Sequence, residues 1–416
     1  MASNQQQQNP PPDPLRVMHV LLSLEAGGME NGVVNLCNRM VDRKFELAIC
    51  CLNTVGEFGS RLDRRVRVQS LEKPLGFHWS AVKQLREAIW NWSPDVLHSH
   101  NLGPLIYSVG ALGPFCSSDS PTLVHGEHAE FRADEKTIRR LGLRKLLYRR
   151  CQGVHTVSSG LSRELVDLGF PKKKIRTILN GVDHVRFRPL DCEEDRSELR
   201  VRLGIPAEAT VLGLVGRFGA LKRHEMLIEG FERLAEMFPD LFLLLVGDRG
   251  PRKAIVLDRI SQSPFSDRIH WAGFQLDPVP WYQILDLQIV PSKNEGLSNA
   301  MLESMAAGVP CMAHPACGAA EIITHGKDGI LGPMNDASEL VDHLKQLLSR
   351  PGALSDLGRN ARETAIEKFS MEAMLRGYED LYRESIGGKG GEPPNSLEKG
   401  SGGGAATRRS QMFSRM

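Results

Sequence analysis

The strongest constraint on the fold is an alternation of short apolar runs with helix-like segments. In the first half of the chain, each run is followed by apolar residues at helical spacing. These runs cover residues 15–24, 45–53, 94–101, 121–128 and 153–158. Strands that alternate with helices pair in parallel, because each helix carries the chain back to the same edge of the sheet. The first half is therefore predicted to form a doubly wound α/β sheet.

The alternation stops over a charged segment, residues 189–207, and then begins again. The second series of apolar runs covers residues 210–218, 241–248, 269–274, 287–292, 310–314 and 329–333. Two similar series joined by a connector predict two Rossmann-like domains that face each other. Ligands of such sheets bind beyond the carboxyl ends of the strands, so the expected site is the cleft between the domains.

The expected organisation follows from these two series. Both ends of the chain are rich in Pro, Gln or Gly, a composition typical of disordered tails. The expected parts are a tail over 1–15, a first domain over 16–188, a connector over 189–207, a second domain over 208–370, a helix over 371–386 that packs back on the first domain, and a tail over 387–416.

Composition narrows the class of protein. The net charge is only +2, which gives no strong field for nucleic acid. The eight cysteines show no metal-ligand spacing and no secretory signal is recognised, so reduced thiols in the cytoplasm are expected. No run approaches the roughly 20 apolar residues that span a bilayer. We expect a cytoplasmic protein that does not bind nucleic acid.

Two glutamates flank the start of a predicted helix. Glu295 lies in a turn and Glu303 lies one turn into the helix, whose N-cap is Ser298 or Asn299. A helix N-terminus offers free N–H groups and partial positive charge to a phosphate. A carboxylate 4 Å from that phosphate would be repelled by about 4 kcal/mol at an effective dielectric of about 20. The glutamates are therefore expected to face hydroxyl groups; the alternative is a loop charge and a solvated helix face.

Basic residues and glycines follow two predicted strands. Arg217 and Lys222 come after the strand that begins at residue 210, where cations would stabilise an anionic ligand. The alternative is a surface pair that caps the next helix. Gly27 and Gly28 follow the first strand and allow a ligand to approach the backbone closely, or they form an ordinary tight turn.

Histidines stand at two other strand ends. Both His125 and His128 are candidates for a cleft histidine that shares a proton near neutral pH; the alternative is a histidine bonded to nearby backbone. His98 and His100 are expected to be structural. Their spacing with His125 and His128 also permits a metal site.

Residues 136–150 form a further candidate feature, because they combine several Lys and Arg with apolar residues at helical spacing. A basic amphipathic helix binds anionic lipid surfaces. The alternative is a solvated helix that packs on the sheet through its leucines.

Taken in order, the motifs resemble the retaining GT-B glycosyltransferases of family 4. The resemblance extends over roughly residues 16–386. It rests on "EAGGMENGVVNL", "PDVLHSHN", "VHGEH", "VHTVSSGLSREL", "ILNGVDHVRFRP", "VGRFGALKRHEMLIEGF", "LVGD", "NEGLSNAMLESMAAGVP" and "GAAEIITHGKDGILGP". The segment "GGMENGVVNLCNRM" together with "HGEH" is most similar to a subgroup tied to bacterial exopolysaccharide and exosortase loci.

This resemblance implies a function and a set of site residues. It implies transfer of a hexose from a nucleoside-diphosphate sugar to a hydroxyl of a glycan or lipid-linked acceptor, with retained anomeric configuration. It implies no cofactor and no metal. The implied catalytic residues are His128, Arg217, Lys222 and Glu295, with His125 as the alternative register of the histidine. The implied donor-binding residues are Gly28, Gly216, Arg217, Lys222, Gly296, Leu297, Ser298, Asn299 and Glu303, and the acceptor-side residues are Gly27 and Gly28.

The sequence departs from the family pattern at two positions. Arg249 stands where a glycine usually follows Asp248, and the segment before Glu321 lacks its usual second glycine.

Two other functions stay open: a sugar-nucleotide epimerase, and a nucleotide-sugar-binding protein without catalysis. The residues do not specify the base of the donor, the sugar or the acceptor.

Overall fold

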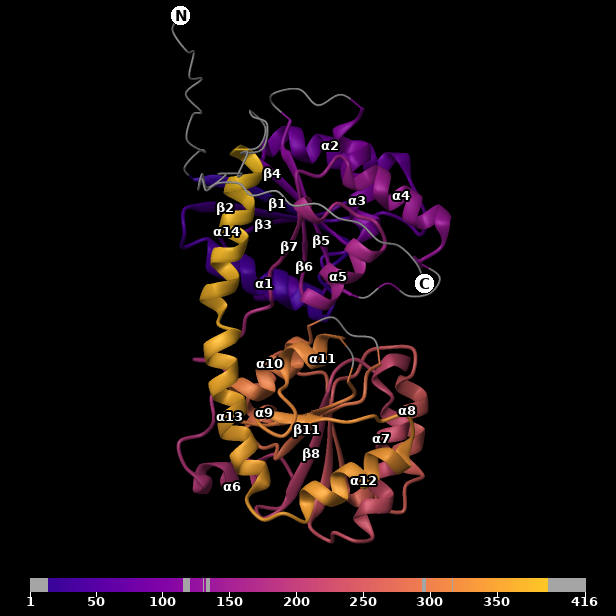
Figure 1. Cartoon of the computed structure of the whole chain (residues 1–416), viewed down its shortest axis with the longest axis vertical. Coiled ribbons are helices and arrows are strands. Elements are labelled where there is room, and N and C mark those ends of the chain that lie inside the picture. Colours follow the sequence, from indigo (N-terminus) through magenta and orange to yellow (C-terminus); the bar gives the residue numbers. More distant parts are fainter. Residues whose placement is uncertain are drawn as a thin grey trace, which may run out of the picture.

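The computed structural model describes residues 14–114, 120–129, 131, 135–293, 297–315 and 317–387. Figure 1 shows two lobes stacked along the long axis, each built around a sheet with helices on both faces. The expected tails lie almost wholly outside the described residues. Glu295 and Gly296 also lie outside them.

Seven described strands form the sheet of the first domain, in the order β3-β2-β1-β4-β5-β6-β7. All neighbouring pairs are parallel. Parallel strands need crossover helices, and the helical segments between the apolar runs supply them. The strands are β1 (Leu15–Leu21), β2 (Phe45–Cys51), β3 (Arg67–Ser70), β4 (Val96–His100), β5 (Thr122–Glu127), β6 (Gly153–Thr156) and β7 (Ile175–Thr177).

The helices of the first domain divide between the two faces of this sheet. One buried cluster joins the sheet to α2 (Trp79–Trp92), α3 (Leu102–Leu112) and α4 (Ile138–Tyr148). A second cluster joins the opposite face to α1 (Gly28–Met40) and to α14 (Met371–Gly387). Helix α5 (Ser159–Asp167) follows β6.

Six described strands form the parallel sheet of the second domain, in the order β10-β9-β8-β11-β12-β13. The strands are β8 (Thr210–Val215), β9 (Leu241–Val246), β10 (Ile269–Gly273), β11 (Leu287–Val290), β12 (Cys311–Ala313) and β13 (Gly329–Leu331). The helices are α6 (Glu193–Arg202), α7 (His224–Ala235), α8 (Lys253–Ser261), α9 (Val279–Gln283), α10 (Asn299–Ala306), α11 (Cys317–Ile322), α12 (Ala337–Leu348) and α13 (Ala353–Lys368).

The end of the chain returns to the first domain. Figure 1 shows α13 and α14 running along one side of the molecule, α13 beside the lower lobe and α14 beside the upper one. Tyr378, Leu381 and Tyr382 of α14 are buried in the cluster that contains Leu15 and Val17 of β1. The last helix therefore completes the core of the domain that the chain built first.

The predicted fold class, two Rossmann-like doubly wound sheets, is confirmed. Both sheets direct the carboxyl ends of their strands toward the boundary between the lobes, which is where the site was expected. Among the described residues, no helix combines the length and the apolar character that crossing a bilayer requires.

Candidate active site

A narrow hollow lies between the two domains at the N-terminal ends of α1 and α10. The segment that leaves the first domain closes its third side. The hollow is lined by Asn31, Gly32, Asn35, Asn180, Gly181, Val182, Asp183, Phe187, Asn299, Leu302, Glu303 and Met374. Residues from both domains thus meet at one place, as the facing sheets predicted.

Helix α10 begins at this boundary with an uncapped N-terminus. Ser298 is its N-cap and has an extended backbone, yet its side chain accepts no capping hydrogen bond. The helix ends before Gly308, which has a φ of 78°. Because a helix start carries unpaired N–H groups and a partial positive charge, this end of α10 suits an anion.

Lys222 lies beside that helix start. It lines a second small hollow together with Ser298, Ala300 and the ends of β8 and β11. Its stem runs over Gly216, where an added Cβ would lie 3.2 Å from the lysine Cε. The absence of a side chain at Gly216 lets the ammonium stem pass, so a cation and a helix N-terminus share one edge of the second sheet.

Glu303 points from α10 toward the first domain. Its Oε2 accepts a hydrogen bond from the Tyr282 hydroxyl at 2.9 Å, and its Oε1 accepts one from Asn31 Nδ2 at 2.9 Å. Burial raises the pKa of this carboxyl above its usual value, against the lowering effect of the two hydrogen bonds. The carboxylate accepts from one hydroxyl group and one amide, and the amide comes from the opposite domain.

The glycine turn after β1 also meets α10. Asn299 Nδ2 donates to the Gly28 carbonyl at 2.7 Å. An added Cβ at Gly28 would meet nothing within 4 Å, whereas one at Gly27 would lie 2.2 Å from the Glu30 carboxylate. Gly28 thus presents open backbone to the second domain, while the space over Gly27 holds a side chain of its own helix.

Glu30 lies within the electrostatic range of a basic residue of the opposite domain. Burial raises the pKa of Glu30, and the charge of Arg217 counteracts that shift. Arg217 itself is exposed at the end of β8. A local sequence pattern carries no signal of a charge that lies in another domain.

Two residues at or next to the departures from the family pattern bridge the domains. Arg249 forms an ion pair with Glu57 of the first domain. Glu321 accepts from the Ser159 backbone N–H at 2.7 Å and from its hydroxyl at 2.6 Å, at the start of α5. These contacts join residues far apart in the sequence, so sequence reasoning missed them.

The structure separates the two candidate histidines by the face they occupy. His125 is buried toward α4, with its Nδ1 3.0 Å from the Ser99 hydroxyl and its Nε2 3.3 Å from Glu127 Oε1. His128 follows the end of β5 and is partly exposed; its Nε2 lies 2.9 Å from His100 Nδ1. Burial lowers the pKa of His128 to about 4, so its ring is neutral near pH 7. This placement favours His128 as the cleft histidine.

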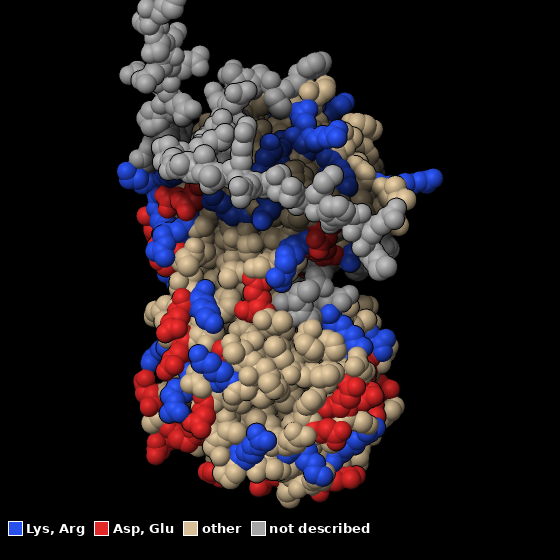
Figure 2. All heavy atoms as spheres, in the orientation of Figure 1, with Lys and Arg blue, Asp and Glu red and all other residues tan. Residues whose placement is uncertain are grey.

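Helix α4 has two faces, and each matches one of the alternatives for residues 136–150. Leu147 and Tyr148 are buried in the core of the first domain. Ile138 and Leu146 are 91% and 59% exposed, next to the exposed basic residues Arg139, Arg140 and Lys145. Figure 2 shows basic side chains standing out from the upper lobe on the side where Figure 1 labels α4. The helix packs on the sheet and still presents a basic, partly apolar surface.

The chain matches two family models, one for each domain. The model described as Glycosyltransferase Family 4 matches residues 26–186, and the model described as Glycosyl transferases group 1 matches residues 195–364.

Relatives with assigned names match over part of their length. The chain is 31% identical over 234 residues to N-acetyl-alpha-D-glucosaminyl L-malate synthase of Bacillus anthracis. This alignment covers 56% of this chain and 60% of that protein. It is 29% identical over 222 residues to the lipopolysaccharide core biosynthesis glycosyltransferase LpsE of Rhizobium meliloti, which covers 53% of this chain and 61% of that protein. The aligned region thus spans about three fifths of these two relatives.

Solved structures share the fold over nearly the whole chain. The Anabaena protein Alr3699/HepE in complex with UDP-glucose superposes with a TM-score of 0.76 at 22% identity. The superposition covers 88% of this chain and 99% of that one. At this identity the likeness shows the fold alone.

Proposed function

We propose, from the premise that the chain belongs to the family 4 glycosyltransferases with the GT-B fold, that it transfers a hexose from a nucleoside-diphosphate sugar to a hydroxyl of a glycan or lipid-linked acceptor. The observation that carries the proposal is the meeting of three groups at one edge of the second sheet. These are the uncapped start of α10, the Lys222 side chain and the Glu303 carboxylate. Together they offer positive charge to a diphosphate and an acceptor to hydroxyl groups.

The diphosphate is assigned to the start of α10. Backbone N–H groups after Ser298 would bind its oxygens, and Lys222 and Arg217 would stabilise the charge that develops as it leaves. Gly216 lets Lys222 reach this position. Because these groups supply the positive charge, we propose that the diphosphate needs no bridging metal.

The nucleoside and the sugar are assigned to either side of the diphosphate. Glu303 would accept hydrogen bonds from the ribose hydroxyls, with the ribose taking the place that Asn31 Nδ2 now holds. Leu297 and Asn299 would line the same side, and Gly27 and Gly28 would face the acceptor. We assign His128, Glu295 and Gly296 to the donor sugar; the last two lie outside the described residues.

Retention of configuration is proposed through a front-face step. The acceptor oxygen forms a bond to the anomeric carbon on the side from which the diphosphate oxygen departs. The carbon–oxygen bond to the diphosphate breaks, and the acceptor proton passes to that leaving oxygen. Positive charge at the start of α10 favours the step because it stabilises the departing oxygen.

The donor and the pathway are proposed from the relatives. HepE was solved in complex with UDP-glucose, so a UDP-hexose is the first donor to test. LpsE is named for lipopolysaccharide core synthesis, which supports a role in exopolysaccharide or cell-envelope polysaccharide synthesis.

Donor binding and transfer are tested together on the full chain. UDP-, GDP- and ADP-hexoses are screened for a rise in Tm, since a ligand that binds only the folded state stabilises it. The selected donor is then incubated with candidate acceptors, and the anomeric configuration of the product is read by NMR. A new α- or β-linked glycoside that keeps the donor's configuration supports the proposal. An altered sugar nucleotide formed without acceptor would identify an epimerase, and donor binding without turnover would identify the non-catalytic alternative.

The exposed face of α4 is proposed to hold the protein at an anionic membrane surface, on the cytoplasmic side where lipid-linked acceptors are found. Each basic residue near such a surface contributes about 1 kcal/mol. Reversing Arg139, Arg140 and Lys145 to Glu should therefore reduce the affinity for phosphatidylserine vesicles, measured by sedimentation, by roughly 100-fold or more.

The matched control reverses three exposed basic residues of the second domain, Lys345, Arg350 and Lys368. This control makes the same change in net charge and should keep vesicle binding. Equal loss in the two triple variants would show a general charge effect and would remove α4 from the proposal.

A further inference from the structure

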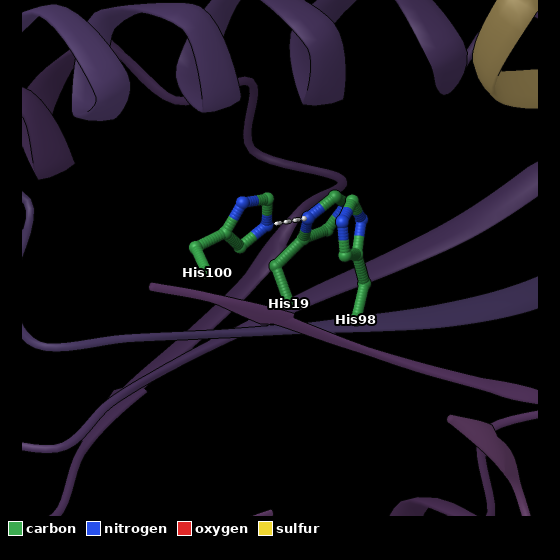
Figure 3. A group of neighbouring side chains, drawn as sticks. All are labelled: His19, His98 and His100. Atoms are coloured by element: carbon green, nitrogen blue, oxygen red, sulfur yellow. Dashed lines mark hydrogen bonds between the residues drawn. The ribbon is translucent and has the colours of Figure 1, made fainter. Parts of the chain in front are cut away.

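Under α14, the face of the first sheet carries histidines where a parallel sheet normally carries apolar residues. His19 of β1, His98 and His100 of β4 and His155 of β6 are all buried, with at most 1% of each exposed. Figure 3 shows His19, His98 and His100 side by side above the strands, with His19 and His100 joined by a hydrogen bond. Four polar rings in one core layer call for a physical reason.

A row of residues across three strands brings part of this cluster to a focus. His100 of β4, Gly126 of β5 and His155 of β6 are in register with one another. An added Cβ at Gly126 would lie 2.3 Å from His155 Nε2 and 3.0 Å from His128 Nε2. The missing side chain at Gly126 is thus the condition that lets these two nitrogens converge above β5.

The third nitrogen comes from His100. Its Nδ1 lies 2.9 Å from His128 Nε2. One ring nitrogen from each of His100, His128 and His155 falls in a group whose members all lie within 4.8 Å of one another. His155 Nε2 also lies 3.0 Å from His98 Nε2.

The convergence of these rings suits a metal ion. A neutral imidazole keeps a lone pair that can bind a cation, and three rings present a nitrogen to the same small volume here. In the described part of the chain, His155 Nδ1 and His19 Nε2 are buried without a hydrogen-bond partner. Hydrogen bonding among the rings is therefore incomplete, although these two nitrogens are not the ones that converge above Gly126.

We infer that His100, His128 and His155 bind a divalent transition-metal ion, with Zn²⁺ as the ion they suit best. Imidazole nitrogen is a preferred ligand of Zn²⁺, and three protein ligands with one open position is a common arrangement. Two nitrogens bound to a tetrahedral Zn²⁺ lie about 3.4 Å apart at bond lengths near 2.0–2.1 Å. The 2.9 Å separation between His100 and His128 needs to widen by only a few tenths of an ångström.

The rest of the cluster supports these ligands. His100 Nε2 lies 2.9 Å from His19 Nδ1, so it can donate to His19 while Nδ1 binds the ion. Metal-ligating histidines are commonly held by such a partner on the second nitrogen. His98 Nδ1 lies 2.9 Å from the Tyr382 hydroxyl, which ties the layer to α14. Metal binding would replace the His98–His155 and His100–His128 hydrogen bonds with coordinate bonds.

The open coordination position faces the cleft. His128 is partly exposed at the carboxyl end of β5, while His100 and His155 lie beneath it. A water molecule or a small anion that enters from the cleft would take the fourth position. The ion would bind Nε2 of His128, which leaves Nδ1 of the same ring for the donor sugar. This site belongs to the first domain and is separate from the diphosphate site at α10.

The metal is measured directly on untagged full-length protein, without an assay of transfer. The protein is stripped with a chelator, dialysed, and titrated with Zn²⁺ while bound metal is counted by mass spectrometry. We expect one equivalent retained per chain and a rise in Tm on zinc addition. Co²⁺ in place of Zn²⁺ should give the intense visible absorption of a four-coordinate site.

Two kinds of variant locate the ion. His155→Gln and His100→Gln should each lose the bound equivalent. Gly126→Ala keeps all three histidines and should also lose it, because the new methyl group fills the space between two ligand atoms. His224→Gln is the control: His224 is buried in the second domain with both ring nitrogens unpartnered among the described residues. It should retain one equivalent.

Several outcomes would overturn the inference. Wild-type protein that retains no zinc and shows no rise in Tm would do so. Retention of the equivalent in both His155→Gln and Gly126→Ala would also do so, because the ion would then lie elsewhere. Circular dichroism identifies a variant that fails to fold, and the conclusion then rests on the folded variants and on the Co²⁺ spectrum of the wild type.

Discussion

The two sheets end at the same boundary but present opposite chemistry to it. The second sheet ends in Arg217, Lys222 and the uncapped start of α10, which together carry positive charge at a partly open edge. The first sheet ends in neutral imidazoles that are mostly buried under α14. Two domains of one fold class thus present different chemistry because the residues that follow their strands differ, while the order of the first six described strands is the same in both.

Direct contacts join these two edges. Asn31 of α1 donates to Glu303, and Asn299 of α10 donates to the Gly28 carbonyl. The Arg249–Glu57 ion pair and the Glu321–Ser159 hydrogen bonds add two more links. The donor would therefore enter a boundary whose polar groups already pair with each other. Substitutions on either edge can show whether the positive charge of the second sheet is sufficient for donor binding and transfer.

The largest effect is expected at Lys222. Lys222→Ala removes a positioned charge next to the start of α10, and the transfer rate should fall by about 10²–10³-fold, or about 3–4 kcal/mol of barrier. The measurement is kcat with saturating donor. Arg223→Gln is the control, since Arg223 donates to the Met334 and Asn335 carbonyls and serves the fold. A control that loses as much rate per folded molecule as Lys222→Ala would contradict the assignment.

A smaller loss is expected at Glu303. Glu303→Gln keeps the size of the side chain but removes the charge that strengthens its hydrogen bonds, worth about 1.5–3 kcal/mol. Calorimetry with UDP should show a Kd weaker by about 10–100-fold, while exposed Glu363→Gln leaves it unchanged. Burial raises the pKa of Glu303, so its carboxylate becomes protonated at a higher pH than an ordinary glutamate does. As the pH is lowered, the affinity of the wild-type protein for UDP should therefore begin to fall before the usual pKa of glutamate is reached. Unchanged affinity in Glu303→Gln would refute the ribose assignment.

The buried histidines of the two domains also differ in their neighbours. Those of the first domain lie at hydrogen-bond distance from one another, whereas in the described chain His224 of the second domain has no histidine at that distance. Burial lowers its pKa from 6.5 to about 4. Between these values the unfolded chain binds a proton that the folded chain does not. The free energy of unfolding therefore falls as the pH drops, by up to about 1.4 kcal/mol per pH unit.

His224→Leu removes this contribution. The free energy of unfolding is measured by urea titration at pH 7 and at pH 5. Its decrease between these two pH values should be about 2 kcal/mol smaller in the variant than in the wild type. Equal losses in the two proteins would show that the His224 ring is protonated within the folded state.

The smallest effect is expected at Asn31, which links the two edges. Asn31→Ala frees one oxygen of Glu303 from a hydrogen bond worth about 1 kcal/mol. If the donor ribose competes for that oxygen, the affinity for UDP should rise about threefold to tenfold in calorimetry. Asn35→Ala is the control, since Asn35 lines the same hollow and pairs instead with Arg61. A weaker affinity in Asn31→Ala would show that Asn31 helps to bind the donor.

Much of this molecule follows from local sequence. The two strand–helix series predict two parallel sheets, because periodicity depends on neighbours a few residues apart. The limits of α10 also follow: Ser298 precedes the helix and Gly308 follows it, where a φ of 78° favours glycine. The expectation that Glu303 would face hydroxyl groups of the donor used charge and spacing, and it stays a prediction.

Other features depended on register and packing. The sequence alone left His125 and His128 as alternatives. The pleat of β5 turns them to opposite faces of the sheet, with Gly126 between two ligand nitrogens of the proposed metal site. Arg249 is a departure from the family pattern and Glu321 follows one, and sequence reasoning assigned a role to neither; the structure shows a partner for each in the other domain.

The sequence by itself determined the two sheets, the helix that begins at the cleft, and the residue types available there. Only the tertiary structure decided which of those residues meet: Asn31 with Glu303, Asn299 with Gly28, and His100 with His128 and His155. The reason is physical. Secondary structure depends on short-range sterics and periodicity, whereas these contacts join strands and domains whose relative position is set by the packing of the whole chain.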